Sequence, residues 1–233
     1  MRSLELNARV ENTRELKQKP VKFELKKIKE HFDEGILSIE KQYRVFDDLQ
    51  DKGMESEGKT ILRSQIVLAE GILDFFIHEM SKYAVYHMFI NQWSKSDKYN
   101  RFSVPMELFE KIVQDQGSSD AFFEFLNERF SREVYLSEEC MKDQLNLIGI
   151  KFSDVMEKAF PAKNQKESIE QGRKVVKELF KRRNEIAHQI DRSHISAEQE
   201  DITKDFVCDN IGYIKSIADA IFDIALQNEQ AEA

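Results

Sequence analysis

Three residues near the end of the chain have the chemistry needed to break a phosphodiester bond. Arg183 and Asn184 are adjacent, and His188 follows the arginine after four intervening residues. A guanidinium binds a phosphate through two parallel hydrogen bonds and stabilises the charge that grows in a transition state. An imidazole titrates near neutral pH and can accept or donate a proton. Together these groups predict cleavage chemistry that requires no metal ion.

The helical spacing of these residues leaves more than one interpretation open. At about 100° per residue, Arg183 lies about 140° from His188 and closer to the apolar side of the helix. Both groups can act on one phosphate only if the helix bends or ends there, or if a second subunit completes the site. The simpler alternatives are a solvated helix face at His188 and a buried salt bridge at Arg183. The apolar face is expected to contain Val176, Leu179, Phe180, Ala187 and Ile190.

The motif and its surroundings resemble the HEPN superfamily. Residues 182–188, Arg-Arg-Asn-Glu-Ile-Ala-His, are similar to its signature of an arginine, a polar residue and a histidine four to six positions later. These residues are most similar to the motif of the RiboL-PSP-associated branch. The resemblance extends over about residues 60–226, including an aliphatic run at 63–77 that contains an acidic residue. Gln189 stands where this branch often has glycine, and the first 59 residues have no recognised counterpart.

The resemblance implies an all-α, HEPN-like helical bundle and a homodimer in which two motif copies form a composite active site. We predict a metal-independent endoribonuclease in which the ribose 2′-hydroxyl attacks the neighbouring phosphate. His188 is the expected general base or acid, and Arg183 stabilises the charged intermediate. Asn184 is expected to hold the phosphate or to tune the imidazole.

An acidic residue on an earlier helix is expected to support this site. Glu70, Asp74 and His78 recur every fourth residue in an otherwise apolar segment. From its position in the resembling segment, we predict that Asp74 orients Arg183 or His188, with Glu70 as the alternative. A carboxylate there would also offset the cost of burying the arginine.

The charge distribution favours RNA as the ligand in spite of the acidic composition. The net charge is -8, yet residues 163–192 contain nine basic and five acidic residues. Such a strip suits a short single strand. The expected RNA contacts are Arg173, Lys177, Lys181 and Arg182, of which the first three share one helical face with Asn184 and His188.

Hydrophobic periodicity predicts helices and no strands. We expect an N-terminal arm with an additional amphipathic helix in residues 1–58, the helix itself covering about 22–49, and a HEPN-like helical domain in 59–229. Within that domain a central helix covers about 59–93, and further helices begin near Pro105, Ser119, Ser137 and Ser153. The motif helix covers about 165–190. Ser196 and Gln199 resemble a capping box that opens the last helix, which ends near residue 227.

Several classes of site and location are not expected. The stretch 53–60 has the spacing of a P-loop, but a charged, helix-like segment precedes it where a buried strand is required. No histidine or cysteine spacing fits a zinc site, so neither a metal nor a cofactor is expected. Two cysteines and a polar N-terminus without a secretory signal predict a cytoplasmic protein, and no segment fits a membrane span.

Two alternatives to a free-standing nuclease remain. One is a non-catalytic HEPN scaffold that dimerises and uses Arg183 and His188 only to bind RNA. The other is a toxin, defence or stress nuclease controlled by an antitoxin or a defence-system partner.

Overall fold

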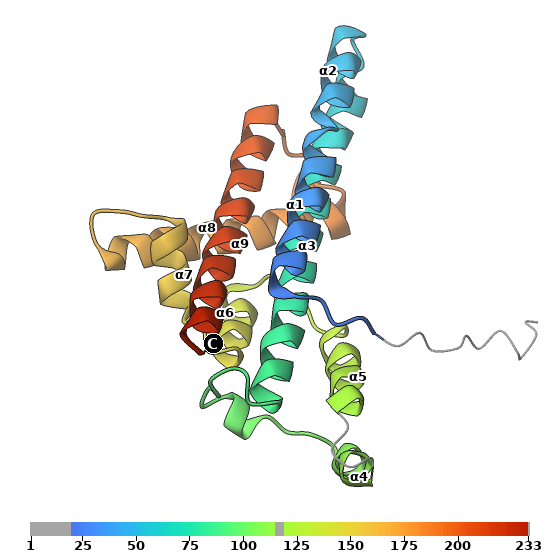
Figure 1. The fold of residues 1–233 in the computed structure, drawn as a ribbon. Coiled ribbons are helices and arrows are strands. Elements are labelled where there is room, and N and C mark those ends of the chain that lie inside the picture. The colour runs from blue at the N-terminus through green and yellow to red at the C-terminus, as the bar shows by residue number, and fades with distance from the viewer. Residues whose placement is uncertain (1–19, 115–118, 233) are drawn as a thin grey trace, which may run out of the picture.

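The structure is a computed structural model that describes residues 20–114 and 119–232. Within those residues the chain is helical and forms no β-strand, which confirms the all-α prediction (Figure 1). In chain order the elements are α1 (Leu25–Glu40), α2 (Tyr43–Asp51), α3 (Glu55–Phe89), a 3-10 turn (Tyr99–Arg101), α4 (Met106–Gln114), α5 (Ser119–Phe130), α6 (Glu138–Leu147), α7 (Phe152–Ala159), α8 (Gln165–Gln189) and α9 (Lys204–Glu232).

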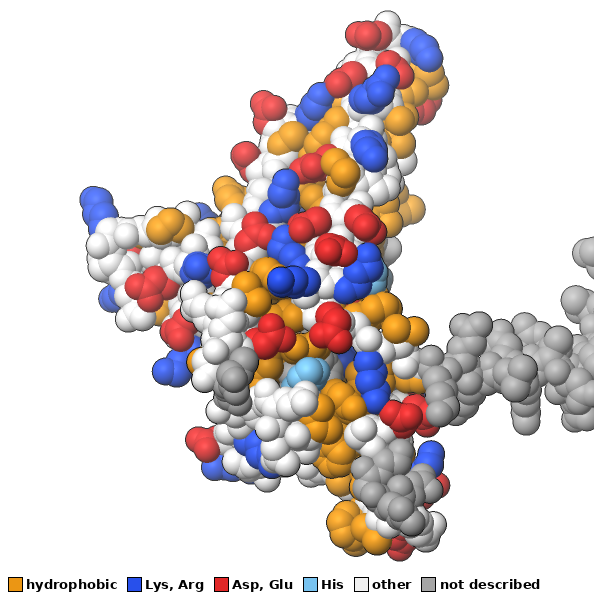
Figure 2. All heavy atoms as spheres, in the orientation of Figure 1, with side chains coloured by type: hydrophobic (Ala, Val, Ile, Leu, Met, Phe, Trp, Pro, Cys, Tyr) orange, Lys and Arg blue, Asp and Glu red, His pale blue; other side chains and the backbone are white. Residues whose placement is uncertain are grey.

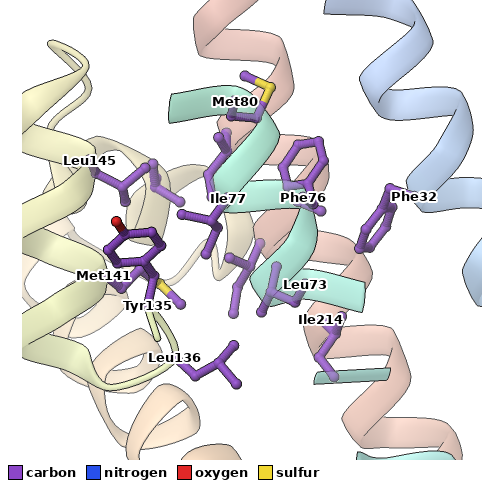
Figure 3. Packing of buried hydrophobic residues seen from close by; sticks show 14 of the residues in the cluster. Phe32, Leu73, Phe76, Ile77, Met80, Tyr135, Leu136, Met141, Leu145 and Ile214 are labelled. Carbon is purple, nitrogen blue, oxygen red and sulfur yellow. The ribbon is translucent and has the colours of Figure 1, made fainter. Parts of the chain in front are cut away.

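The long helix α3 is the central element of the bundle. It contacts α1, α2, α5, α6, α8 and α9. A helix that is apolar around much of its circumference is stable only when neighbours enclose it, and Leu62, Leu73 and Phe76 of α3 are accordingly buried. Figure 3 shows Phe76 beside Phe32 of α1, with the two ring centroids 5.2 Å apart. The boundary predicted after residue 58 falls within the first turn of α3.

The first predicted helix is divided in two, which the sequence analysis did not anticipate. The chain turns at Lys41 and Gln42 between α1 and α2. The buried side chain of Gln65 on α3 donates a hydrogen bond from Nε2 to the carbonyl oxygen of Ile39, at 2.9 Å. A side chain that captures a carbonyl of the last turn is a recognised cause of a helix break. α1 nevertheless packs in the same hydrophobic core as α3.

The motif helix α8 packs against α7, α6 and α3. Its N-terminus is capped by Asn164, whose side chain accepts a hydrogen bond from the backbone N–H of Glu167. Gly172 permits a close approach to α7, because a Cβ at this position would lie 2.4 Å from Sδ of Met156. α8 is therefore fixed at its beginning and along one face, and its bounds agree with the prediction of 165–190.

The predicted start of the last helix at Ser196 is wrong. α9 begins at Lys204, and the side chain of Thr203 accepts a hydrogen bond from the backbone N–H of Phe206 at 3.2 Å. The residues between α8 and α9 form a loop in which Arg192 and Gln199 make an isolated β-bridge. Buried ion pairs hold this loop in place, so tertiary contacts override the local capping signal.

Charges of both signs cover the visible surface of the molecule. Figure 2 shows Lys and Arg side chains interspersed with Asp and Glu side chains over α1 and α9, with apolar atoms between them. Of the helices in the described ranges, none is both long enough and apolar enough to cross a membrane.

Candidate functional site

The three motif residues lie in the last two turns of α8. The helix continues without interruption through Arg183 and His188 and ends at Gln189. His188 is exposed, whereas Arg183 and Asn184 are half-buried. Because the helix is regular here, the two charged groups remain on different faces, as ideal geometry predicts. Within one copy of the chain, bending does not bring them together.

The end of α8 has an unusual backbone conformation. Ile190 and Asp191 have φ angles of 54° and 62°, in the left-handed region. This conformation is uncommon for a β-branched residue and persists only where surrounding contacts enforce it. The N–H groups of Ile190 and Asp191 donate to the carbonyls of Ile186 and Glu185, which closes the helix directly after His188. The glycine that is absent at position 189 is therefore not required for a left-handed turn one residue later.

A buried cluster of charges enforces this turn. The carboxylate of Asp191, 2% exposed, lies 2.7 Å from Nε of Arg63 on α3 and 2.8 Å from Nη1 of Arg182 on α8. Arg182 also pairs with Glu200, and Arg63 donates to the carbonyl oxygen of Glu200 at 2.6 Å. A buried guanidinium requires such partners. The cluster thus joins α3, α8 and the following loop.

Arg182 was expected to contact RNA, but the structure places it in this buried cluster. Its side chain is buried and engaged by two carboxylates, so it does not present donors to a ligand. The sequence analysis missed Asp191 and Glu200 as its partners. One signal was present: Arg63 is a charged residue in an apolar segment, and a buried arginine needs an anion.

Arg183 has a different environment from its neighbour. Its Nη1 donates to Oδ1 of Asn184 at 2.9 Å, and its Nε is buried without a hydrogen-bond partner in the described residues. Glu70 of α3 is only 1% exposed, and its Oε1 likewise has no such partner there. Burial raises the pKa of the Glu70 carboxyl to about 8, Arg183 opposes this rise, and Asp74 adds to it. Glu70 is therefore the acidic group within electrostatic reach of Arg183.

Asp74 forms its hydrogen bonds outside the motif. Its Oδ1 accepts a hydrogen bond from the backbone N–H of Tyr135 at 2.7 Å, and its Oδ2 lies 3.6 Å from Nε2 of His78. In the described part of the chain no hydrogen bond joins Asp74 to Arg183 or His188. The carboxylate instead fixes the chain before α6. Helical spacing in the sequence does not reveal this hydrogen bond.

The three remaining basic residues of the predicted strip are exposed but have acidic neighbours. Nε of Arg173 and Nζ of Lys177 each lie 3.0 Å from Glu138 on α6. Lys181 lies 3.7 Å from Glu185 one turn away. Exposed pairs of this kind contribute little and exchange readily with other anions. The strip is consequently less positive than its sequence suggests, although its cations remain accessible.

An apolar hollow adjoins the motif on the surface. It has a volume of about 430 Å³ and lies between α3 and the end of α8. Val67, Leu68, Ala187 and Ile190 contribute to its wall, and Ile190 is 70% exposed. The expectation that Ala187 and Ile190 face the core is wrong, because Arg182 and Ile186 occupy the buried side at this end of α8. Exposed apolar surface of this kind often marks an interaction site.

No metal site is evident among residues 20–114 and 119–232, where no three His, Cys, Asp or Glu side chains gather closely enough to hold an ion.

Comparison with known proteins gives one match. The family model described as RiboL-PSP-HEPN matches residues 24–227, a segment that includes α1 and α2 as well as the motif helix. No curated protein and no solved structure matches the chain.

Proposed function

Because the chain belongs to the RiboL-PSP-HEPN family, we propose that it is a metal-independent endoribonuclease that cleaves RNA by transesterification. Family membership supports a nuclease or RNA-binding role in general terms. The specific reaction is our proposal, and it rests on the chemistry of the residues at the end of α8.

The contrast between the two neighbouring arginines carries this proposal. Arg182 is held by carboxylates, whereas Arg183 donates to the neutral side chain of Asn184 and lies within electrostatic reach of Glu70, whose pKa is raised to about 8. A proton on Glu70 at neutral pH leaves the positive charge of Arg183 without a full counter-charge. Such a cation, about one and a half turns from an exposed imidazole on the same helix, is suited to bind and polarise a phosphate.

The reaction requires a base and an acid. The 2′-hydroxyl loses its proton to the imidazole of His188 while its oxygen bonds to phosphorus, and the P–O5′ bond breaks as the leaving oxygen gains a proton from water. The products are a 2′,3′-cyclic phosphate and a 5′-hydroxyl. Arg183 binds the non-bridging oxygens, and Asn184 holds the guanidinium through Oδ1, which leaves its amide N–H groups for the phosphate. Arg173, Lys177 and Lys181 bind the strand beyond the cleaved bond.

A homodimer would supply what one copy lacks. Arg183 and His188 lie on different faces of a regular helix, so a second copy could place its His188 opposite Arg183 of the first. The apolar hollow with Leu68 and Ile190 supports an interface beside the motif. In such a dimer the two motif copies form a composite site.

The test is cleavage of end-labelled single-stranded RNA in the presence of EDTA. We expect activity in wild type and a loss of roughly 100-fold or more in His188→Ala and Arg183→Ala. Two exposed residues outside the site, His194 and Arg44, provide matched controls as alanine variants. A 2′-deoxy substitution at the cleaved nucleotide should abolish cleavage, because the nucleophile is absent. Activity that survives in both motif variants, or that requires a metal, would contradict the proposal.

A non-catalytic scaffold that uses Arg183 and His188 only to bind RNA is the second candidate, because family membership supports an RNA-binding role as well as a nuclease role. RNA binding that remains in His188→Ala, together with no cleavage by wild type, would select this function. If the protein is a toxin, defence or stress nuclease, expression should arrest growth, and both His188→Ala and an antitoxin or defence-system partner should relieve the arrest.

A further inference from the structure

A second groove lies along α3, the helix that also contains Glu70. It has a volume of about 370 Å³ and lies between α3 and the C-terminal end of α5. Its wall includes Gly71, Asp74, Phe75, His78, Asn127 and Ser131. Glu70, which precedes this segment, is within electrostatic reach of both Arg183 and Asp74. The groove wall therefore begins at Gly71, the residue that follows Glu70 on α3.

The groove presents an aromatic ring with open space beside it. Phe75 is 51% exposed, although the next residue, Phe76, is 1% exposed in the core. Gly71 lies one turn before Phe75 on the same side of α3, and a Cβ at Gly71 would meet no atom within 4 Å. Glycine within a helix is destabilising relative to alanine, and no packing contact requires it here. The bare backbone leaves room for a flat group to lie on the ring of Phe75.

The polar groups of the groove are suited to a neutral ligand. Lys82, its only lysine, is held by Glu79 at 2.5 Å and by Asn127 at 2.9 Å. A phosphate would therefore meet the Asp74 carboxylate without a free cation to balance it. Oδ2 of Asp74 and Nε2 of His78, 3.6 Å apart, offer an acceptor and a donor side by side. A stacking surface next to such a pair fits a nucleobase.

We propose that this groove binds an unstacked guanine of the single-stranded RNA substrate. The inference rests on the proposed function. Guanine carries an acceptor, O6, followed by two adjacent donors, N1–H and the 2-amino group. The Asp74 carboxylate, whose Oδ1 also accepts from the backbone N–H of Tyr135, accepts from the two donors through its remaining lone pairs. The imidazole N–H of His78 donates to O6, and the base stacks on Phe75. Other bases lack two neighbouring donors for the carboxylate.

The test measures binding without cleavage. The probes are fluorescent 2′-O-methyl tetranucleotides that contain one guanine, adenine or inosine among uracils, titrated by anisotropy with full-length protein. We expect guanine to bind roughly tenfold more tightly than adenine, with inosine, which lacks the 2-amino group, in between. Phe75→Ala and Asp74→Asn should each reduce the affinity for the guanine probe to that of the adenine probe.

Two further variants keep the test independent of folding. Gly71→Leu should fill the open space and weaken binding of the guanine probe roughly tenfold, with an unchanged circular dichroism spectrum. Phe109→Ala is the matched control, because Phe109 on α4 is 57% exposed and lies outside the groove. Its affinity should equal that of wild type.

The inference is overturned if guanine and adenine probes bind equally, or if Phe75→Ala binds the guanine probe as wild type does. Its failure differs from failure of the nuclease proposal. A protein that prefers guanine but does not cleave RNA would support the base pocket and contradict the nuclease proposal. A protein that cleaves RNA without a preference for guanine would support the nuclease proposal and contradict the base pocket.

Discussion

The two adjacent arginines of the motif have different environments because they lie on different sides of α8. Successive residues point about 100° apart, so Arg182 faces the loop that contains Asp191 while Arg183 faces Glu70. The first receives full counter-charge from carboxylates. The second is left with donors that a ligand can use. A sequence motif alone does not distinguish these two fates.

Replacement of Asp191 with asparagine should unfold the protein more easily. Arg63 and Arg182 would remain buried with their shared anion removed, which typically costs about 3–5 kcal/mol of stability. Urea denaturation measures the change in the free energy of unfolding. Arg183→Ala is the control and should cost much less, because Arg183 lacks an ion pair of this kind. Equal losses in the two variants would contradict the division of roles between the arginines.

The stability of the native state should depend on the protonation of Glu70. The pKa of this carboxyl rises from its ordinary 4.5 to about 8 in the fold, chiefly through burial. Between these values the folded chain retains a proton that the unfolded chain releases, so this group lowers stability as the pH rises. Its contribution falls by up to about 1.4 kcal/mol per pH unit.

Glu70→Gln should remove this contribution. Urea denaturation from pH 5 to pH 8 is the measurement, and the difference between wild type and variant should grow with pH in favour of the variant. A difference that is constant across this range would show that the carboxyl is not protonated in the native state.

At the scale of the helices, local sequence patterns were sufficient to predict the helix bounds where no tertiary contact opposed them. The caps of α6 and α8, at Ser137 and Asn164, lie where serine or asparagine precedes an amphipathic run. Errors arose where a distant group intervened. The carbonyl of Ile39 is captured by Gln65, and the loop before α9 is held by Arg63 and Arg182. Such contacts join residues far apart in the sequence, so no local signal reports them.

The residues of the candidate site could be selected from the sequence, but their contacts with distant residues could not. Arg183, Asn184 and His188 could be selected from residue type and spacing, because each side chain has a chemistry of its own. The carboxyl near Arg183 could be narrowed to Glu70 or Asp74 by helical periodicity. The choice between them depended on Tyr135, whose backbone N–H engages Asp74. Exposure of Ala187 and Ile190 depended on Asp191 drawing Arg182 inward.

Close packing between α7 and α8 should make one glycine essential. In Gly172→Ala the new methyl group would lie 2.4 Å from Sδ and 2.9 Å from Cβ of Met156. Overpacking of this kind typically costs about 1–3 kcal/mol. Gly212 on α9 is the matched control, since a Cβ there meets nothing within 4 Å. Gly212→Ala should raise stability by roughly 0.5–1 kcal/mol through the better helix propensity of alanine.

The two glycine variants should therefore shift thermal unfolding in opposite directions. Calorimetry or circular dichroism melting gives the comparison. If Gly172→Ala is as stable as Gly212→Ala, α7 and α8 do not approach as closely as the structure shows.

At the scale of the whole molecule, the proposed reaction requires a cation and an imidazole at one phosphate, although the two groups lie on different faces of α8. A bend does not bring them together, since α8 is regular through both residues. An apolar hollow with exposed Leu68 and Ile190 lies directly beside them. Association of two copies over this surface would remove apolar area from water and bring Arg183 of one copy towards the imidazole of the other.

A composite site makes a distinct prediction for mixed dimers. Arg183→Ala and His188→Ala should each be inactive alone. After the two proteins are unfolded together and refolded, about half of the dimers combine one copy of each variant, and each mixed dimer contains one intact site of two. We expect recovery of about a quarter of wild-type activity. A site formed within one copy would give no recovery, because every copy then carries a defect. Leu68→Glu in both variants is the control, since a charge in the apolar hollow should prevent association and abolish the recovery.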